Sequence, residues 1–207
     1  MAGEDATSGQ TCPRGVMLVQ GVAALDRHLT LWINQHHHPA LDLLFRGVSR
    51  LGDAGVAWLI VVGLVLIFGA RRDRLIALIF FGGLLLTEYS AMPLLRDLWH
   101  RPRPYTYMDA IRTLGPEWDY PSFPSAHAHL WGQATLLFAV AYPRLRWPLI
   151  VLLVLTLYSR PYVGNHHVLD VLAGLALGLA FGAFELLVAW NAGLLRAKAK
   201  GRVKTEE

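Results

Sequence analysis

Residues 54–70 read AGVAWLIVVGLVLIFGA and are followed by the basic residues Arg71, Arg72 and Arg74. A helix that crosses a bilayer needs about 20 mostly apolar residues, with a lower limit of about 17. The stretch meets this limit without a charged side chain, and a basic cluster is the usual flank of a span on the cytoplasmic side. It therefore predicts a membrane-spanning helix, and with it the class of the fold.

The composition of the whole chain also indicates a membrane protein. Of its 207 residues, 54% are hydrophobic and 16% are Asp, Glu, Lys or Arg, whereas soluble domains average about 45–50% and about 25%. The hydrophobic content excludes a disordered chain, and a single cysteine, Cys12, excludes a disulfide-stabilised scaffold. The net charge of +4 fits basic loops at a membrane face, and we expect no nucleic-acid partner.

Four further apolar segments follow, at residues 75–95, 126–142, 147–159 and 171–195. Together with residues 54–70 they predict an all-α integral membrane protein, a bundle of five transmembrane helices. Acidic residues inside a span are functional candidates. We expect Glu88, in the second span, either to orient Arg96 through a neighbour or to reach a polar cavity.

Residues 1–52 are less apolar than the rest. The apolar run 16–25 is interrupted by Asp26, and residues 41–51 place apolar side chains at helical spacing among charged ones. This pattern predicts N-terminal amphipathic helices lying in the membrane interface. If residues 16–32 span the bilayer instead, the bundle has six spans and a cytoplasmic N-terminus.

The basic residues predict the orientation of the bundle. Those in two loops and after the last predicted span fall on one side of a five-span chain: Arg71, Arg72, Arg74, Arg144, Arg146, Arg196, Lys198, Lys200, Arg202 and Lys204. We expect that side, with the C-terminus, to be cytoplasmic in a multi-pass cell-membrane protein. The chain is then one domain, made of an interfacial region (1–52), a transmembrane catalytic bundle (53–195) and a basic tail (196–207).

Three separated segments reach the opposite, extracytoplasmic face of this bundle. They are residues 96–104 (RDLWHRPRP), 124–127 (PSAH) and 159–170 (SRPYVGNHHVLD). Pro102 and Pro104 predict that the second span ends near Arg101. The aromatic and acidic loop 105–123 is expected to roof the site between these segments. Five tryptophans near span ends predict an aromatic belt at the interfaces: Trp58, Trp99, Trp131, Trp147 and Trp190.

Arg96, Arg103 and Arg160 have the chemistry of a phosphate cradle. An arginine is permanently charged, and its planar fork matches pairs of phosphate oxygens. Ser125 can donate a hydroxyl, and the backbone N–H groups around Ala126 open a helix N-terminus, which favours anions. Because the arginines supply the positive charge, we expect neither a metal nor a cofactor.

His166 and Asp170 are four residues apart, so on a helix they share a face. A carboxylate bonded to one imidazole nitrogen fixes the tautomer and leaves the other nitrogen free to attack. His127 comes from another span and is then available as the general acid. The three residues predict hydrolysis through a phosphohistidine at His166. We expect His129, two residues past His127, to be a packing residue.

In order and spacing, the three segments resemble the signature motifs of the type 2 phosphatidic acid phosphatase superfamily. The resemblance covers residues 96–170 and implies that His166 is the nucleophile, Asp170 its partner and His127 the acid and base. It also implies that the three arginines hold the phosphate.

Two positions depart from the family pattern. Arg96 stands where Lys is usual, which keeps the charge and adds a fork. Ala126 stands where Gly is usual. The difference matters only if the backbone at this position needs a positive φ, which glycine adopts more readily than alanine.

The short chain resembles the small bacterial members, whose substrates include undecaprenyl diphosphate, phosphatidylglycerophosphate and phosphatidate. We therefore expect a lipid phosphate substrate. A lipid-to-lipid phosphotransferase and a non-catalytic transporter or scaffold remain alternatives, and the oligomeric state is left open. A haloperoxidase is disfavoured by the apolar spans, since those relatives are soluble.

Overall fold

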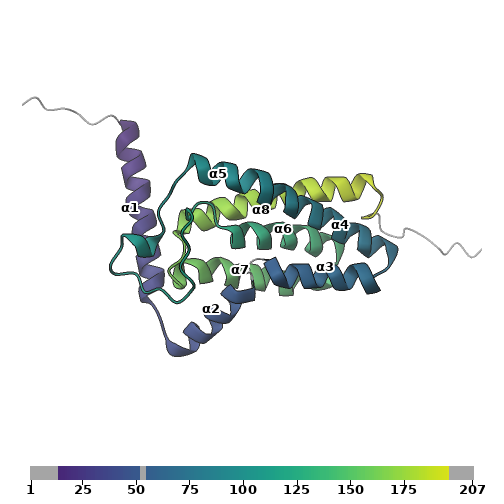
Figure 1. Cartoon of the computed structure of the whole chain (residues 1–207), viewed down its shortest axis with the longest axis horizontal. Coiled ribbons are helices and arrows are strands. Elements are labelled where there is room, and N and C mark those ends of the chain that lie inside the picture. Colours follow the sequence, from purple (N-terminus) through teal and green to yellow (C-terminus); the bar gives the residue numbers. More distant parts are fainter. Residues whose placement is uncertain (1–13, 52–54, 196–207) are drawn as a thin grey trace, which may run out of the picture.

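The computed structural model describes residues 14–51 and 55–195, and this part of the chain is helical with no strand. Its α-helices are α1 (Arg14–Gln35), α2 (Pro39–Leu51), α3 (Val56–Phe68), α4 (Arg71–Leu86), α5 (Met92–Leu98), α6 (Ala126–Ala141), α7 (Arg146–Tyr162) and α8 (Val168–Asn191). Helices α3 to α8 run side by side as a bundle, α1 lies across one end, and α2 leads from α1 into the bundle (Figure 1). The predicted all-α fold is confirmed.

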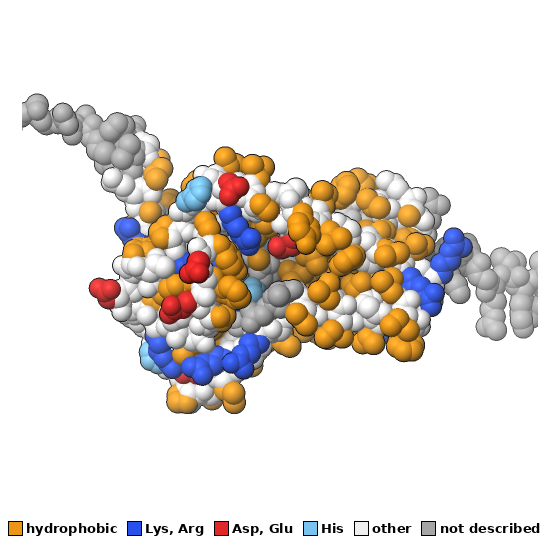
Figure 2. Space-filling model, viewed as in Figure 1, with side chains coloured by type: hydrophobic (Ala, Val, Ile, Leu, Met, Phe, Trp, Pro, Cys, Tyr) orange, Lys and Arg blue, Asp and Glu red, His pale blue; other side chains and the backbone are white. Residues whose placement is uncertain are grey.

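Each predicted span contains a helix, but the helices differ in length. Two continuous segments within the described residues are long and apolar enough to cross a bilayer alone, Arg71–Leu98 and Val168–Asn191. Helices α3, α6 and α7 have 13, 16 and 17 residues. Apolar side chains cover the middle of the face seen in Figure 2, and Lys and Arg side chains gather towards its ends. The count of five spans stays a prediction.

The second predicted span is irregular near the site. A π-helical turn, Thr87–Ala91, joins α4 to α5 just before Pro93. Proline has no N–H and its ring crowds the carbonyl four residues earlier, so the helix widens there. The helix ends at Leu98 rather than near Arg101, which corrects our expectation. Beyond the helix end, the Arg101 carbonyl accepts a hydrogen bond from Ser122 N at 2.9 Å, so this segment pairs with the end of the loop 105–123.

The closest helix pair is α6 with α8. A Cβ at Gly174 would lie 2.3 Å from Ser125 O, and one at Gly178 would lie 2.2 Å from His129 O. Only glycine permits this separation, and small residues serve the same purpose in other membrane bundles. The contact places the start of α6, which carries His127, beside the start of α8.

Two tryptophans assigned to the aromatic belt lie in the core instead. Trp58 and Trp131 are buried among apolar side chains of α3, α4 and α6. The Trp58 ring stacks on Phe138 with a centroid distance of 5.4 Å. Because these rings face other helices, their burial stabilises the bundle rather than an interface. The other three, Trp99, Trp147 and Trp190, are exposed.

Helix α1 turns a polar face to the bundle. Asp26, Thr30 and Asn34, spaced by four residues, are buried, while Leu18 and Val22 are exposed. The Thr30 hydroxyl accepts a hydrogen bond from Val168 N at 3.1 Å. The helix is therefore amphipathic, with its apolar side outward. Its place in the membrane interface stays a prediction.

The predicted basic side is one end of the bundle. Arg72 at the start of α4 donates to Leu194 O at 2.7 Å and to Ala141 O at 3.1 Å. The start of α4 and the ends of α6 and α8 therefore meet. The basic tail 196–207 and residues 1–13 and 52–54 lie outside the described residues.

Candidate active site

The predicted site residues gather at the end of the bundle opposite Arg72. Six of them are buried, with exposed fractions of at most 9%, namely Arg103, Ser125, His127, Arg160, His166 and Asp170. Arg96 and Ala126 are half-buried. Burial of this many polar groups requires partners, and the partners define the geometry below.

His166 lies in the turn between α7 and α8. Its Nδ1 donates to Ser122 O at 2.8 Å, and Asp170 Oδ2 lies 3.7 Å from the same nitrogen. We predicted a hydrogen bond between the His166 ring and the Asp170 carboxylate. In the structure, the acceptor of the Nδ1 proton is the Ser122 carbonyl instead. With the proton on Nδ1, Nε2 carries the lone pair. Burial lowers the pKa of His166 to about 3, and the charges of Arg160 and Arg103 act in the same direction.

Asp170 is held by an arginine that the sequence analysis did not assign to the site. Arg101 Nη1 donates to Asp170 Oδ1 at 2.7 Å, and its Nη2 pairs with Asp26 of α1. Asp170 Oδ2 also accepts from His167 N at 2.9 Å, as the cap of α8. Asp26 appeared in the sequence only as an interruption of an apolar run, so nothing there linked it to Asp170.

Tyr120 of the predicted roof holds two of the cradle arginines. The Arg96 and Arg103 guanidinium carbons lie 4.9 and 4.7 Å from the centre of its ring, within the range of cation–π attraction. Arg103 also donates to Tyr120 O and Asn165 O, both at 3.0 Å. The loop therefore fixes the direction of these side chains.

His127 and Arg160 meet at Ser49, near the end of α2. His127 Nε2 donates to Ser49 O at 3.1 Å, and Arg160 Nη1 donates to Ser49 Oγ. Ser49 is buried. The second and third motifs are also joined directly, because Ser125 N donates to Asp170 O at 3.0 Å.

Helix α6 begins at Ala126, where a helix start was predicted, and Ser125 is its N-cap. The Ser125 Oγ accepts from Ala128 N at 3.5 Å, so the hydroxyl proton remains available to donate. His129, one turn along α6, is fully buried and stands near the Phe181 ring, as expected for a packing residue.

An apolar cavity of about 520 Å³ adjoins this end of the bundle. Its wall includes Leu59, Phe81, Leu84, Leu85 and Leu130, together with Arg96, Ala126 and His127. Glu88 of the π-helical turn also lines it, as does Arg96, and the choice between the two roles considered for Glu88 stays a prediction. The cavity thus connects polar motif residues with an apolar surface of α3 and α4.

Comparison with known proteins identifies the family of the chain. Residues 76–194 match the family model of the PAP2 superfamily. Undecaprenyl-diphosphatase of Sulfolobus acidocaldarius is 33% identical over 149 residues, covering 70% of this chain and 69% of the relative. Decaprenylphosphoryl-5-phosphoribose phosphatase of Mycobacterium tuberculosis is 31% identical over 179 residues, covering 84% and 90%.

Two solved structures share the fold. Aquifex aeolicus LpxE aligns with a TM-score of 0.65 at 24% identity, over 77% of this chain and 93% of that one. A transmembrane PAP2-type phosphatidylglycerolphosphate phosphatase from Bacillus subtilis also has a TM-score of 0.65, at 22% identity, over 83% and 87%. The family model, which covers more than half of the chain, and the 33% identity to the Sulfolobus acidocaldarius relative show that the protein belongs to the PAP2 superfamily.

Proposed function

We propose that the protein is a membrane lipid phosphatase that hydrolyses a lipid phosphate or diphosphate through a phosphohistidine at His166. The observation that carries the proposal is the environment of this imidazole. Its Nδ1 is committed to Ser122 O at 2.8 Å, and its low pKa keeps the ring neutral. A neutral, oriented imidazole is a competent nucleophile.

The reaction has two steps. In the first, the Nε2 lone pair of His166 forms a bond to phosphorus while the bond to the leaving oxygen breaks, and His127 gives its proton to that oxygen. In the second, His127 takes a proton from water as the water oxygen bonds to phosphorus, and the phosphorus–nitrogen bond breaks to release phosphate. Ser49 O holds the proton-bearing Nε2 of His127 until the leaving oxygen replaces it.

Arg96, Arg103 and Arg160 supply the positive charge that builds up around phosphorus in the transition state. Tyr120 orients the first two and Ser49 the third. Ser125 adds its hydroxyl. Because these groups supply positive charge at phosphorus, we expect catalysis without a divalent metal.

The apolar cavity beside Arg96 and His127 accommodates the start of a lipid chain. The names of the relatives point to lipid-linked phosphates, among them undecaprenyl diphosphate and decaprenylphosphoryl-5-phosphoribose. We place the site at the extracytoplasmic face of the cell membrane, because the loops with Arg72 and Arg144 lie at the other end.

A panel of lipid phosphates assayed for phosphate release in detergent tests the function. We expect release from wild type that survives EDTA, inhibition by vanadate, and no release from His166→Ala. An acid-labile phosphoenzyme is expected to accumulate in a variant that slows the second step. A new phospholipid formed without inorganic phosphate would instead indicate a phosphotransferase, and unchanged function of His166→Ala would indicate a non-catalytic protein.

A further inference from the structure

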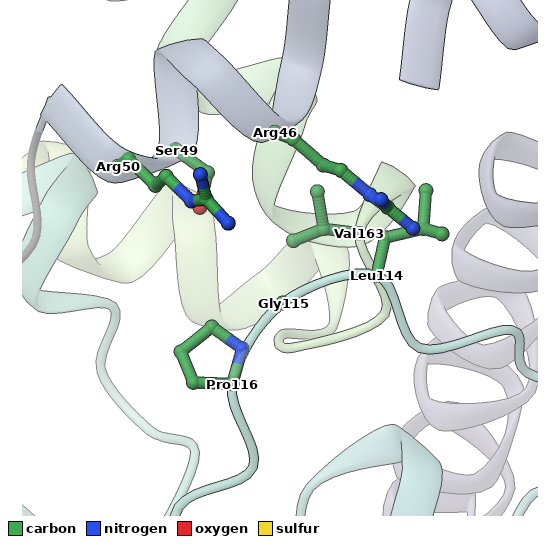
Figure 3. Close-up of a pocket in the computed structure, with 7 residues that line it drawn as sticks. All are labelled: Arg46, Ser49, Arg50, Leu114, Gly115, Pro116 and Val163. Carbon is green, nitrogen blue, oxygen red and sulfur yellow. The ribbon is translucent and has the colours of Figure 1, made fainter. Parts of the chain in front are cut away.

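Helix α2 presents two arginines to a second cavity beside the site. This cavity has a volume of about 400 Å³ and is lined by Arg46, Ser49 and Arg50 of α2, by residues 114–116, and by Val163. Figure 3 shows the guanidinium groups of Arg46 and Arg50 extending from α2 towards the loop that carries residues 114–116. The mechanism proposed above uses neither arginine.

Within the described residues, these two arginines differ from Arg101 and Arg112 in having no acidic partner. Arg112 is paired with Asp42, with Nη1 3.2 Å from Oδ1, and Arg101 is paired with two carboxylates. Neither Arg46 nor Arg50 makes a hydrogen bond or ion pair with any residue that the structure describes. Two guanidinium groups without a partner in this part of the chain, one turn apart on a helix, give this wall of the cavity a positive charge.

Ser49 joins this cavity to the phosphate cradle. It lines the cavity, and its two oxygen atoms contact the side chains of His127 and Arg160. An anionic group bound in this cavity and a phosphate bound in the cradle would therefore lie on the two sides of Ser49. Two anionic groups of one headgroup are neighbours in the same way.

The wall opposite α2 is fixed to the catalytic turn. Leu114 N donates to Val163 O at 3.0 Å, and Asn165 Nδ2 donates to Pro116 O at 2.8 Å. A Cβ at Gly115 would lie 2.6 Å from Asn165 Oδ1, so a larger residue there would push the wall away. The cavity is therefore a formed feature with one rigid wall and one basic wall.

We propose that Arg46 and Arg50 form a second phosphate-binding subsite, which holds the non-reacting anionic group of a headgroup that carries two. The substrate class is a lipid diphosphate or a lipid-linked phosphosugar phosphate. Arginine forks bind such groups in pairs of hydrogen bonds, while a lipid monophosphate leaves the subsite empty. The inference rests on the proposed function and narrows its substrate.

The test compares a lipid diphosphate with the monophosphate of the same chain in a neutral detergent. We expect Arg46→Gln and Arg50→Gln each to raise KM for the diphosphate about tenfold more than KM for the monophosphate, since a charge-assisted contact is lost. The value of kcat for the diphosphate should stay within about twofold. Arg46→Lys should restore part of the loss. Arg144→Gln, at the opposite end, is the matched control.

Two results would overturn the subsite. One is an equal change, or no change, for the two substrates. The other is a selective effect that appears only in vesicles containing anionic phospholipid and is absent in neutral detergent, because the arginines would then bind bulk lipid. If wild type releases phosphate from neither substrate, the proposed function itself fails, and that outcome is distinct from both.

Discussion

Replacing Asp26 by Asn tests whether α1 supports Asp170, the proposed partner of His166. The side chains of Asp26 and Asp170 are 1% and 0% exposed, and that of Arg101, which joins them, is 18% exposed. Asn keeps the size of the side chain and an oxygen for Leu169 N, which donates to Asp26 Oδ1 at 2.8 Å. The change therefore removes the charge while preserving the shape.

The expected loss follows from the burial of this ion-pair network. Breaking a buried pair costs about 3–5 kcal/mol, and we expect the lower end, about 3 kcal/mol, because Arg101 keeps Asp170. For a chain of this length that corresponds to a fall of roughly 6–12 °C in the unfolding midpoint. Without the charge of Asp26, Arg101 is held by Asp170 alone. The position of the Asp170 carboxylate beside His166 is then less fixed, so kcat should fall about tenfold.

Thermal unfolding in detergent and steady-state kinetics on one lipid phosphate measure the two effects. The Asp97→Asn variant, at an exposed position nearby, is the control and should behave as wild type. In a double-mutant cycle with Arg101→Met, the double variant should lose less stability than the sum of the losses of the two single variants. Wild-type stability of Asp26→Asn, or strictly additive losses in the cycle, would refute a supporting role for α1.

Three further outcomes are expected. Gly178→Ala should lower the unfolding midpoint by several degrees and reduce activity, because its Cβ would lie 2.2 Å from a carbonyl of α6; Gly82→Ala, which meets open space, should be neutral. Tyr120→Leu should raise KM about tenfold through loss of two cation–π contacts, and Tyr120→Phe should keep most of the affinity. Because the pKa of His166 is lowered from 6.5 to about 3, the unfolded chain takes up a proton first, so stability falls as the pH drops below 6.5. His166→Phe should reduce the loss between pH 7 and about pH 4.5 by about 3 kcal/mol, and an unchanged pH profile would count against burial of a neutral imidazole.

The sequence predicted the parts of the site that lie within motifs. Arg103, His127, His166 and Asp170 converge because residue spacing and helix direction bring those segments to one end of a bundle. It did not predict Ser49, whose contact with His127 joins positions 78 residues apart. A serine in an amphipathic helix carries no signal of such a partner.

The sequence pattern also did not predict which aromatic side chains are buried. Trp58 and Trp131 lie near the ends of apolar segments, where lipid headgroups and helix neighbours are equally compatible with a tryptophan. Their burial depends on which face of α3 meets α6, and hydropathy within a uniformly apolar helix does not distinguish the faces. The length of α4 and α5 was easier to predict, although the π-helical turn was not.

The N-terminal helices α1 and α2 lie outside the family model but contribute side chains to the candidate site. Residues 76–194 match the family model and contain the two histidines and the three cradle arginines, whereas Asp26 and Ser49 lie before them. A part of the chain outside the shared model therefore contacts His127 and Arg160 through Ser49, and Arg101 through Asp26. Relatives can keep the same reaction centre while changing the side chains that α2 places beside it. On this argument, differences in headgroup preference within the family should follow residues equivalent to Arg46 and Arg50 more closely than any motif residue.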